Sequence, residues 1–353
     1  MMELWHAVNG LLAGGESLVA AAVTVKDGSA PGPAGARMFV RDDAELLGTV
    51  GGGPMEGRTI AEAAAVMAHG RPTILPIDLS GEIGDGSDAI CGGLVHVFLE
   101  RLDPTPDVVS LFSRLADELA ANRTCFLVSS LGRGERHAPA RALLSRDGAV
   151  LAGSLPDAAL VAAPALAWGS TAPTVASLAG EDYFLEPFRA REPLIICGAG
   201  HIARPTAHLA AMAGFWVVVL DDREEFASSA RFPDADEVAV LPSFDDCFAG
   251  RVLDADTSVV IVSRCHKQDR KILTQALRTE AGYIGMIGSG RKVAAVLEEQ
   301  RERGVPRERL AVVHAPVGLP IGGDSPAEIA ISIVAQCIKE RTGRREGRKT
   351  RAA

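Results

Sequence analysis

The clearest chemical motif in this sequence is a glycine-rich turn, GAGHIA, at 198–203. Its G-x-G-x-x-A spacing is typical of turns that hold a dinucleotide pyrophosphate, because glycines let backbone N–H groups approach a phosphate at a helix start. Asp221 and Asp222 follow at the distance where such folds place an acid that bonds a ribose hydroxyl. The motif therefore predicts a site for a phosphate-bearing ligand.

Two residues near this motif leave the identity of the ligand open. His201 follows the second glycine, where its imidazole can either crowd a pyrophosphate or donate a hydrogen bond to it. The charge of Asp221 would repel the 2′-phosphate of NADP, whereas Arg223 would attract it. The motif thus indicates a phosphate site without selecting a plain NAD site.

Three later loops also follow predicted strands. The segment RCHKQD at 264–269 places Cys265 at a helix start among cations, which suits either a reactive thiol or a half-buried structural residue. The segment GSGRK at 288–292 joins backbone amides to two cations and predicts a second anion site. The loop at 318–323 precedes a capping box, Ser325 to Glu328. We expect these loops to wall one cleft, because open α/β sheets bind ligands where their strands end.

The first half of the chain carries two glycine-rich motifs of its own. TVGGGPMEG at 49–57 can bring backbone close to a ligand, although a tight hairpin explains it equally well. CGG at 91–93 leaves the Cys91 thiol accessible, and a thiolate is a soft ligand suited to metal or sulfur chemistry. Asp85 and Asp88 lie nearby and oppose the formation of a thiolate.

Two kinds of periodicity predict the elements that position these motifs. The second half alternates apolar strands and helical patterns, which predicts a Rossmann-like, doubly wound parallel sheet. Its strands are expected at 194–197, 215–221, 237–241, 258–263, 283–287 and 310–313. The first half mixes short strands with helices near 55–69 and 108–121, which predicts a mixed α/β domain of undetermined strand order.

The length of 353 residues favours two domains. We expect an N-terminal domain over 1–188, including a linker-like stretch rich in Ala, Pro and Ser from 152 onwards. A C-terminal domain follows over 189–341. The basic segment 342–353 has almost nothing apolar to bury, so we expect a disordered tail.

Composition excludes several classes of function. A net charge of −9 argues against general binding to nucleic acid. No apolar stretch is long enough for a membrane helix and the N-terminus does not resemble a signal peptide, so we expect a cytoplasmic protein without a membrane partner. Six scattered cysteines without a C-x-x-C motif favour neither disulfides nor zinc.

Taken together, the motifs resemble the XdhC/CoxI family, the accessory proteins of xanthine dehydrogenase and related molybdenum hydroxylases. The resemblance covers about 15–340 and rests on five segments: GTVGGGPMEG, AICGGLVHVFLE, LIICGAGHIARP with the following residues to DADEV, YIGMIGSGRK and APVGLPIGGDSPAEIAISI. It implies an N-terminal XdhC/CoxI domain, a C-terminal Rossmann-like XdhC domain and a homodimer. The implied function is that of a chaperone, without catalytic residues, that binds molybdenum cofactor, as molybdopterin or its dinucleotide form, and delivers it to the hydroxylase. A cysteine desulfurase is a further candidate partner.

The resemblance, together with the loops above, also implies a set of cofactor-binding residues. They are Gly51, Gly52, Gly53, Glu56, Cys91, Gly92, Gly198, Gly200, His201, Asp221, Asp222, Arg223, Arg264, His266, Asp269, Gly288, Ser289, Arg291 and Lys292. Cys91 is the first candidate for a contact with molybdenum, and Cys265 is a weaker one. The chain departs from the family pattern at Cys265, where a glycine is usual, and at Gly290, where an arginine is frequent.

The hypothesis for the cofactor places its phosphate end on the turn at 198–201, with Cys91 facing the dithiolene and molybdenum across the domain interface. The competing hypothesis is an NAD(P)-dependent oxidoreductase that uses His201 or His266 as a proton donor. It shares the fold but leaves the N-terminal glycine motifs without a role. A ligand-sensing regulator without chemistry is a third hypothesis.

Overall fold

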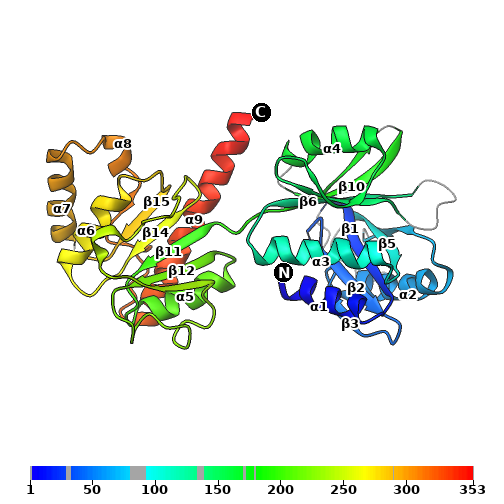
Figure 1. The fold of residues 1–353 in the computed structure, drawn as a ribbon, viewed down its shortest axis with the longest axis horizontal. Coiled ribbons are helices and arrows are strands. Elements are labelled where there is room, and N and C mark those ends of the chain that lie inside the picture. Colours follow the sequence, from blue (N-terminus) through cyan, green and yellow to red (C-terminus); the bar gives the residue numbers. More distant parts are fainter. Residues whose placement is uncertain are drawn as a thin grey trace, which may run out of the picture. The chain divides into compact units, whose positions relative to one another are not determined.

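The chain forms two compact units, Met1–Ala190 and Arg191–Ala353, called unit 1 and unit 2 below. They run from blue to green and from green to red in Figure 1, which draws a computed structural model. The structure describes residues 2–28, 33–79, 93–132, 139–169, 172–178, 180–288 and 290–352. Among the helices of these described residues, none is long and apolar enough to cross a membrane.

Unit 1 contains the same order of elements twice. The first half comprises α1 (Met2–Ala13), β1 (Leu18–Gly28), β2 (Arg37–Arg41), β3 (Leu46–Gly48), α2 (Gly53–His69), β4 (Thr73–Asp78) and β5 (Gly93–Leu102). The second comprises α3 (Pro106–Ala120), β6 (Cys125–Ser130), β7 (Arg141–Ser145), β8 (Val150–Ser154), α4 (Asp157–Gly169), β9 (Thr174–Leu178) and β10 (Glu181–Phe188). The sheet orders, β3-β2-β1-β5-β4 and β8-β7-β6-β10-β9, are the same when the strands are numbered within each half. All pairings are antiparallel, so unit 1 is a doubled α/β arrangement.

The two halves of unit 1 exchange ion pairs. Arg37 begins β2 and pairs with Glu186 of β10, while Arg141 begins β7 and pairs with Glu100 of β5. All four side chains are buried. Helices α1 and α3 meet through Trp5, whose ring stacks on Phe112 with centroids 5.9 Å apart. Apolar packing and reciprocal charges therefore hold the halves together.

One stretch of unit 1 differs from expectation. The segment from 152 to 188, predicted to be linker-like, contains α4, β9 and β10, and β10 is a central strand of the second sheet. Its composition obscured this because the Ala-rich α4 has little amphipathic contrast, while the strand β10 carries Glu186 on its buried side.

Unit 2 has one six-stranded, fully parallel sheet in the order β13-β12-β11-β14-β15-β16. The strands are β11 (Pro193–Cys197), β12 (Trp216–Asp221), β13 (Glu237–Val240), β14 (Ser258–Ile261), β15 (Tyr283–Met286) and β16 (Val313–His314). Numbered within the unit, the order is 3-2-1-4-5-6, which is the Rossmann order and confirms the predicted fold class. The predicted strand at 310–313 is displaced, because the short helix α8 (Arg307–Leu310) occupies its beginning.

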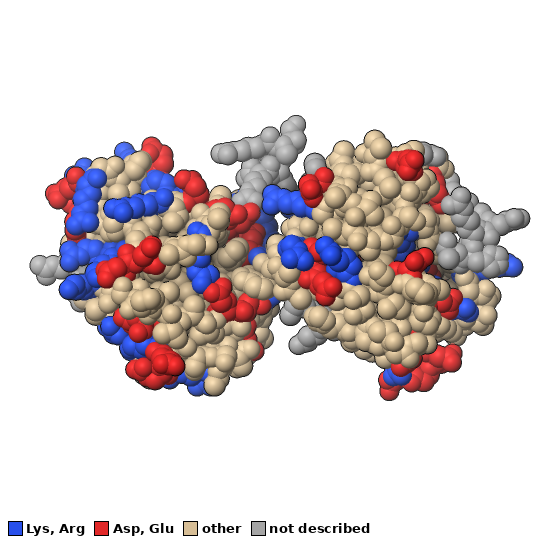
Figure 2. Space-filling model, in the orientation of Figure 1, with Lys and Arg blue, Asp and Glu red and all other residues tan. Residues whose placement is uncertain are grey.

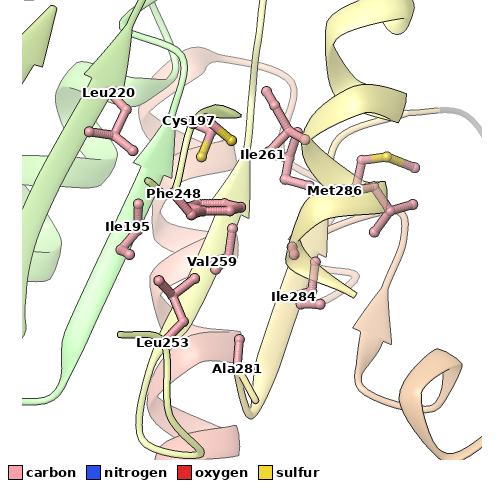
Figure 3. Close-up of a cluster of buried hydrophobic side chains, with 14 of the residues drawn as sticks. Ile195, Cys197, Leu220, Phe248, Leu253, Val259, Ile261, Ala281, Ile284 and Met286 are labelled. Atoms are coloured by element: carbon pink, nitrogen blue, oxygen red, sulfur yellow. The ribbon is translucent and has the colours of Figure 1, made fainter. Parts of the chain in front are cut away.

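Helices cover both faces of this sheet. One face packs against α6 (His266–Ala276) and α7 (Gly290–Glu302) through residues such as Ile195, Val259 and Ile284, drawn in Figure 3. The other packs against α5 (Ala203–Met212) and α9 (Pro326–Ala352). Burial on both faces explains why these strands read as continuous apolar runs in the sequence.

Where a disordered tail was expected from 342 onwards, α9 continues through Ala352. Ser325 begins the helix as the predicted capping box, with Glu328 N donating to Ser325 Oγ and Ser325 N to Glu328 Oε2. Arg344 and Arg345 both pair with Glu192 at the start of unit 2. These ion pairs give the basic segment a partner that its composition did not reveal.

Candidate functional site

The glycine-rich turn joins β11 to α5 at the centre of the sheet in unit 2. Gly198 has φ +113°, and a Cβ there would lie 2.5 Å from the Val262 carbonyl oxygen, so only glycine lets this turn lie against the end of β14. A Cβ on Gly200 would meet no atom within 4 Å. The space over Gly200 is open. In the first turn of α5, Arg204 N donates to the Gly200 carbonyl at 3.4 Å and Pro205 has no N–H, so the N–H groups that a phosphate can use are those before Arg204. This geometry suits a phosphate.

Asp221 at the end of β12 holds the turn in place through a hydrogen bond from Ala199 N. Its carboxylate, 1% exposed, accepts from Ala199 N at 2.7 Å and from Arg223 N, Nε and Nη2 at 2.8 to 3.0 Å. Burial raises the pKa of Asp221, but the hydrogen bonds from Arg223 and Ala199 outweigh it and hold the pKa below its ordinary value. A carboxylate has about four acceptor positions, and all are used here. Asp221 therefore shapes the turn rather than bonding a ribose.

Charged side chains also connect the ends of β12 and β14. Arg264 donates from both terminal nitrogens to Asp222, at 3.0 and 2.9 Å. Two arginines that were not among the predicted site residues lie beside the turn. Arg204 is exposed in the first turn of α5, and Arg231 donates to the Ala199 carbonyl at 3.4 Å. They line a cavity of about 310 Å³ and supply positive charge close to Gly200.

A larger cavity of about 410 Å³ opens between α6, α7 and the end of β15. Its lining residues are His266, Lys267, Asp269, Arg270, Met286, Ile287, Gly288, Val293, Ala295 and Val296. Asp269 is 5% exposed and accepts from Ser263 Oγ at 2.5 Å. Burial raises the pKa of Asp269, although Ser263 and the nearby His266 act in the opposite direction.

Several predicted site residues lie around this cavity. His266 and Asp269 face each other with Nδ1 and Oδ2 3.7 Å apart, and Gly288 lies just after β15 at the cavity wall. Cys265 is exposed at the start of α6. Ser289 and the side chains of Arg291 and Lys292 lie outside what the structure describes, so the second anion site stays a prediction.

The loop at 318–323 is fixed to α9. Gly318 N donates to Gln336 Oε1 at 2.8 Å, and the same oxygen accepts from Tyr283 Oη at 2.7 Å. Ser332 Oγ donates to the carbonyl of Leu319. The loop is therefore held in place next to β15 by polar contacts from the last helix.

In unit 1 the glycine motif surrounds an acid. Gly52 N donates to Glu56 Oε2 at 3.3 Å, Gly51 N donates to Thr49 Oγ1 at 3.1 Å, and Thr49 is hydrogen-bonded to Glu56. Gly51, Gly52 and Gly53 all have positive φ, which explains the run of glycines. The carboxylate of Glu56 already occupies this turn, which makes it a poor site for an anion.

The described cysteines are unpaired, and all but Cys265 are buried. Cys91 and Gly92 lie outside the described residues, so their role stays a prediction. Within the described ranges, no group of three His, Cys, Asp or Glu residues could hold a metal ion.

Comparison with known proteins identifies relatives of both units. A family model described as the XdhC Rossmann domain matches residues 194–337, and one described as the XdhC and CoxI family matches residues 11–78. The chain is 27% identical to a probable xanthine dehydrogenase subunit of Bacillus subtilis, covering 95% of this chain and 96% of that protein. It is 26% identical to the molybdenum cofactor insertion chaperone PaoD of Escherichia coli, covering 97% of this chain and 89% of that protein.

Two further comparisons differ in extent. The uncharacterized protein YqeB of Escherichia coli is 34% identical over 156 residues, but the match spans 44% of this chain and only 28% of YqeB. A crystal structure described as a xanthine dehydrogenase from Bacillus halodurans superposes with a TM-score of 0.76 at 28% identity. That similarity covers 97% of this chain and 96% of the other, so it includes both units.

Proposed function

Because the chain belongs to the XdhC and CoxI family, we propose that it is an accessory protein that binds molybdenum cofactor and delivers it to xanthine dehydrogenase or a related molybdenum hydroxylase. The observation that carries this proposal is the match to a molybdenum cofactor insertion chaperone over 97% of the chain. A match of that extent includes unit 1, whereas a shared Rossmann sheet alone would support only unit 2.

The geometry of unit 2 supports a phosphate-bearing cargo. Molybdenum cofactor carries a terminal phosphate, or a pyrophosphate in its dinucleotide form, and the open turn at Gly200 with the start of α5 offers backbone N–H groups for either. Arg204 and Arg231 add positive charge beside the turn. His201 is exposed at the turn, where its imidazole can donate to the phosphate.

The alternative, an NAD(P)-dependent oxidoreductase, shares the strand order and the glycine spacing. Such enzymes use an acid at the end of the second strand to bond the ribose hydroxyls. In this chain the corresponding Asp221 is buried and its acceptor positions are filled by Ala199 and Arg223. The other predicted acid, Asp222, is hydrogen-bonded by both terminal nitrogens of Arg264. These partners of the two acids support the accessory role over a dinucleotide oxidoreductase.

The finer parts of the proposal concern partners and the metal. We propose that Cys91 contacts the molybdenum end of the cofactor, that Cys265 is a weaker second candidate, and that the working form is a homodimer. A cysteine desulfurase is the proposed source of sulfur during maturation of the cofactor. Purification of the Cys91→Ala protein with cofactor tests the first point, because unchanged retention of molybdenum and pterin would remove Cys91 from the site.

The test of the function as a whole is to purify the protein from cells that make molybdenum cofactor, denature it and identify the released small molecules. We expect molybdenum and a pterin, detected by mass spectrometry of the metal and by pterin fluorescence. Release of NAD(H) or NADP(H) without a pterin would instead support the oxidoreductase.

A further inference from the structure

The cavity between α6 and α7 has the composition of a small-molecule site. Its volume of about 410 Å³ lies within the range of roughly 300 to 1,000 Å³ that is usual for ligand pockets. Met286, Ile287, Val293 and Val296 make its walls apolar, as the flat faces of a ring require.

Among the charged and polar residues that line this cavity, His266, Lys267 and Arg270 are exposed, whereas Asp269 is buried. Asp269 is 5% exposed and lies among the lining residues. Within the described part of the chain, its hydrogen bonds come from Ser263, and His266 Nδ1 at 3.7 Å from Oδ2 is too distant for a hydrogen bond. A carboxylate offers about four acceptor positions, so Asp269 can still receive two donors from a ligand.

The shape of a carboxylate selects the kind of ligand. Its two coplanar oxygens match two adjacent N–H donors on the edge of a planar ring, as in other bidentate pairs. A pterin carries such an edge in its 2-amino group and the neighbouring ring N–H, and guanine carries the same 2-amino-4-oxo-pyrimidine edge. Adenine places an acceptor beside its amino group, and nicotinamide has a single amide, so neither matches.

Ser263 connects this cavity to the phosphate turn. A Cβ on Gly198 would lie 2.8 Å from Ser263 Cα, so the turn and Ser263 are in close contact. The hydroxyl of Ser263 donates to Asp269 Oδ1. A ligand with a phosphate at one end and a heterocycle at the other can therefore use both places along the same edge of the sheet.

We propose that the cavity between α6 and α7 binds a 2-amino-4-oxo-pyrimidine ring, with Asp269 accepting hydrogen bonds from the ring N–H and the 2-amino group. The pterin of molybdenum cofactor and the guanine of a nucleotide share this chemistry. The assignment to a pterin rests on the proposed function, whereas recognition of the edge itself does not.

Direct titration of the full-length protein tests the recognition. Calorimetry measures the binding of four probes: 6-hydroxymethylpterin, guanosine monophosphate, adenosine monophosphate and nicotinamide mononucleotide. We expect the pterin, the guanine nucleotide or both to bind. The probe with the higher affinity shows whether the cavity is a pterin site or a guanine site. Equal binding of the adenine nucleotide, or no binding of either matching probe, would overturn the proposal.

Two substitutions with matched controls test the place of binding. In Asp269→Asn an amide donor replaces one acceptor, so affinity should fall roughly tenfold or more. Asp245→Asn, at an exposed carboxylate of the same unit outside the cavity, should leave affinity unchanged. Ala295→Trp fills the cavity from an exposed position of α7 and should abolish binding. Ala294→Trp, also at an exposed position but not lining the cavity, should not. Unchanged affinity in Asp269→Asn and Ala295→Trp would contradict the proposal.

Cofactor retention separates this proposal from the proposed function. In one outcome, the wild type retains molybdenum and pterin, and the Asp269→Asn and Ala295→Trp proteins retain them equally. In that case the assignment of the ring to this cavity is wrong, and the accessory role stands. If the wild type retains neither molybdenum nor pterin, the accessory role fails. The titrations with pterin and guanine nucleotide then still test whether the cavity binds the ring.

Discussion

The two units use charged side chains in opposite ways. In unit 1 the pairs Arg37–Glu186 and Arg141–Glu100 have both partners buried and join one half of the unit to the other. In unit 2 the pair Arg264–Asp222 lies at the carboxyl edge of the sheet, and the Arg264 side chain is 43% exposed. On the face drawn in Figure 2, unit 2 also carries more charged side chains than unit 1. These pairs of unit 1 are therefore internal, whereas Arg264–Asp222 of unit 2 lies at an accessible edge of the sheet.

The same contrast recurs within unit 2, between two buried acids. Asp221 is surrounded by donors from the protein, and its pKa lies below the ordinary value. Asp269 accepts its hydrogen bonds from Ser263 among the described residues, and burial holds its pKa above the ordinary value. Asp221, with its donors supplied by the protein, stabilises the fold, whereas Asp269 keeps acceptor positions for the ligand that we propose.

The largest effect should follow from breaking a pair in unit 1. In Glu186→Ala, Arg37 stays buried without its partner, which should lower the free energy of unfolding of unit 1 by about 3–5 kcal/mol. Urea unfolding of the whole chain, with hydrogen exchange to separate the two units, measures this loss. A decrease below about 1 kcal/mol would mean that the pair does not hold the halves together.

A double variant serves as the control for this prediction. Burial raises the pKa of Glu186 even though Arg37 acts against it, and the Nε of Arg37 has no hydrogen-bond partner among the described residues. The pair therefore does not fully offset the cost of burying its charges. Arg37→Met with Glu186→Leu should be close to wild type in stability, unlike the single variant.

A smaller loss is expected from Asp221→Asn in unit 2. The amide loses charge-assisted hydrogen bonds to Ala199 and Arg223, which should cost about 2–3 kcal/mol at neutral pH. Because the pKa of Asp221 is lowered in the folded state, its stabilisation is present above the unfolded-state pKa and disappears as the pH falls through the folded-state pKa. Unfolding measured from neutral to acid pH should show the two proteins converging in acid. A constant difference would contradict this role of the charge.

The substitution Asp269→Asn should change the free energy of unfolding at neutral pH in the opposite direction to Asp221→Asn, or leave it unchanged. The raised pKa of Asp269 means that its contribution is present below the unfolded-state pKa and is lost as the pH rises through the folded-state pKa. Asparagine keeps an acceptor for Ser263 and cannot ionise, so the variant should be at least as stable as wild type at neutral pH. The same unfolding series checks this. A less stable variant would show that the ionised form of Asp269 is a structural group like Asp221.

Much of unit 2 could be predicted from sequence, because strands buried on both faces produce apolar runs and the turns between them carry their own residue signals. The role of Asp221 could not. Its spacing after the glycines is the same whether the carboxylate faces a ribose or turns inward to Ala199. The cavity beside Asp269 depends on how α6 and α7 pack, which the RCHKQD motif at 264–269 does not encode.

Unit 1 was less predictable for a different reason. Its two halves share an element order but no obvious sequence repeat, so the doubling appears only in the sheet orders. Arg37 and Glu186 are 149 residues apart, and nothing local to either indicates the other. Polar residues on central strands such as β10 also disrupt the apolar alternation by which strands are recognised.

A small effect on stability is expected at the pair Arg264–Asp222, at the carboxyl edge of the sheet in unit 2. Arg264→Ala removes a pair whose cation is 43% exposed, and solvent screening should limit the change in unfolding free energy to about 0.5 kcal/mol. If Arg264 binds the anionic cofactor, retention of molybdenum and pterin should nevertheless fall severalfold in the purified protein. Arg301→Ala, at an exposed pair with Glu298, is the control and should change neither quantity. A large loss of stability without loss of cofactor would place Arg264 with the internal charges of unit 1, because an arginine that serves a ligand should be nearly dispensable to the fold.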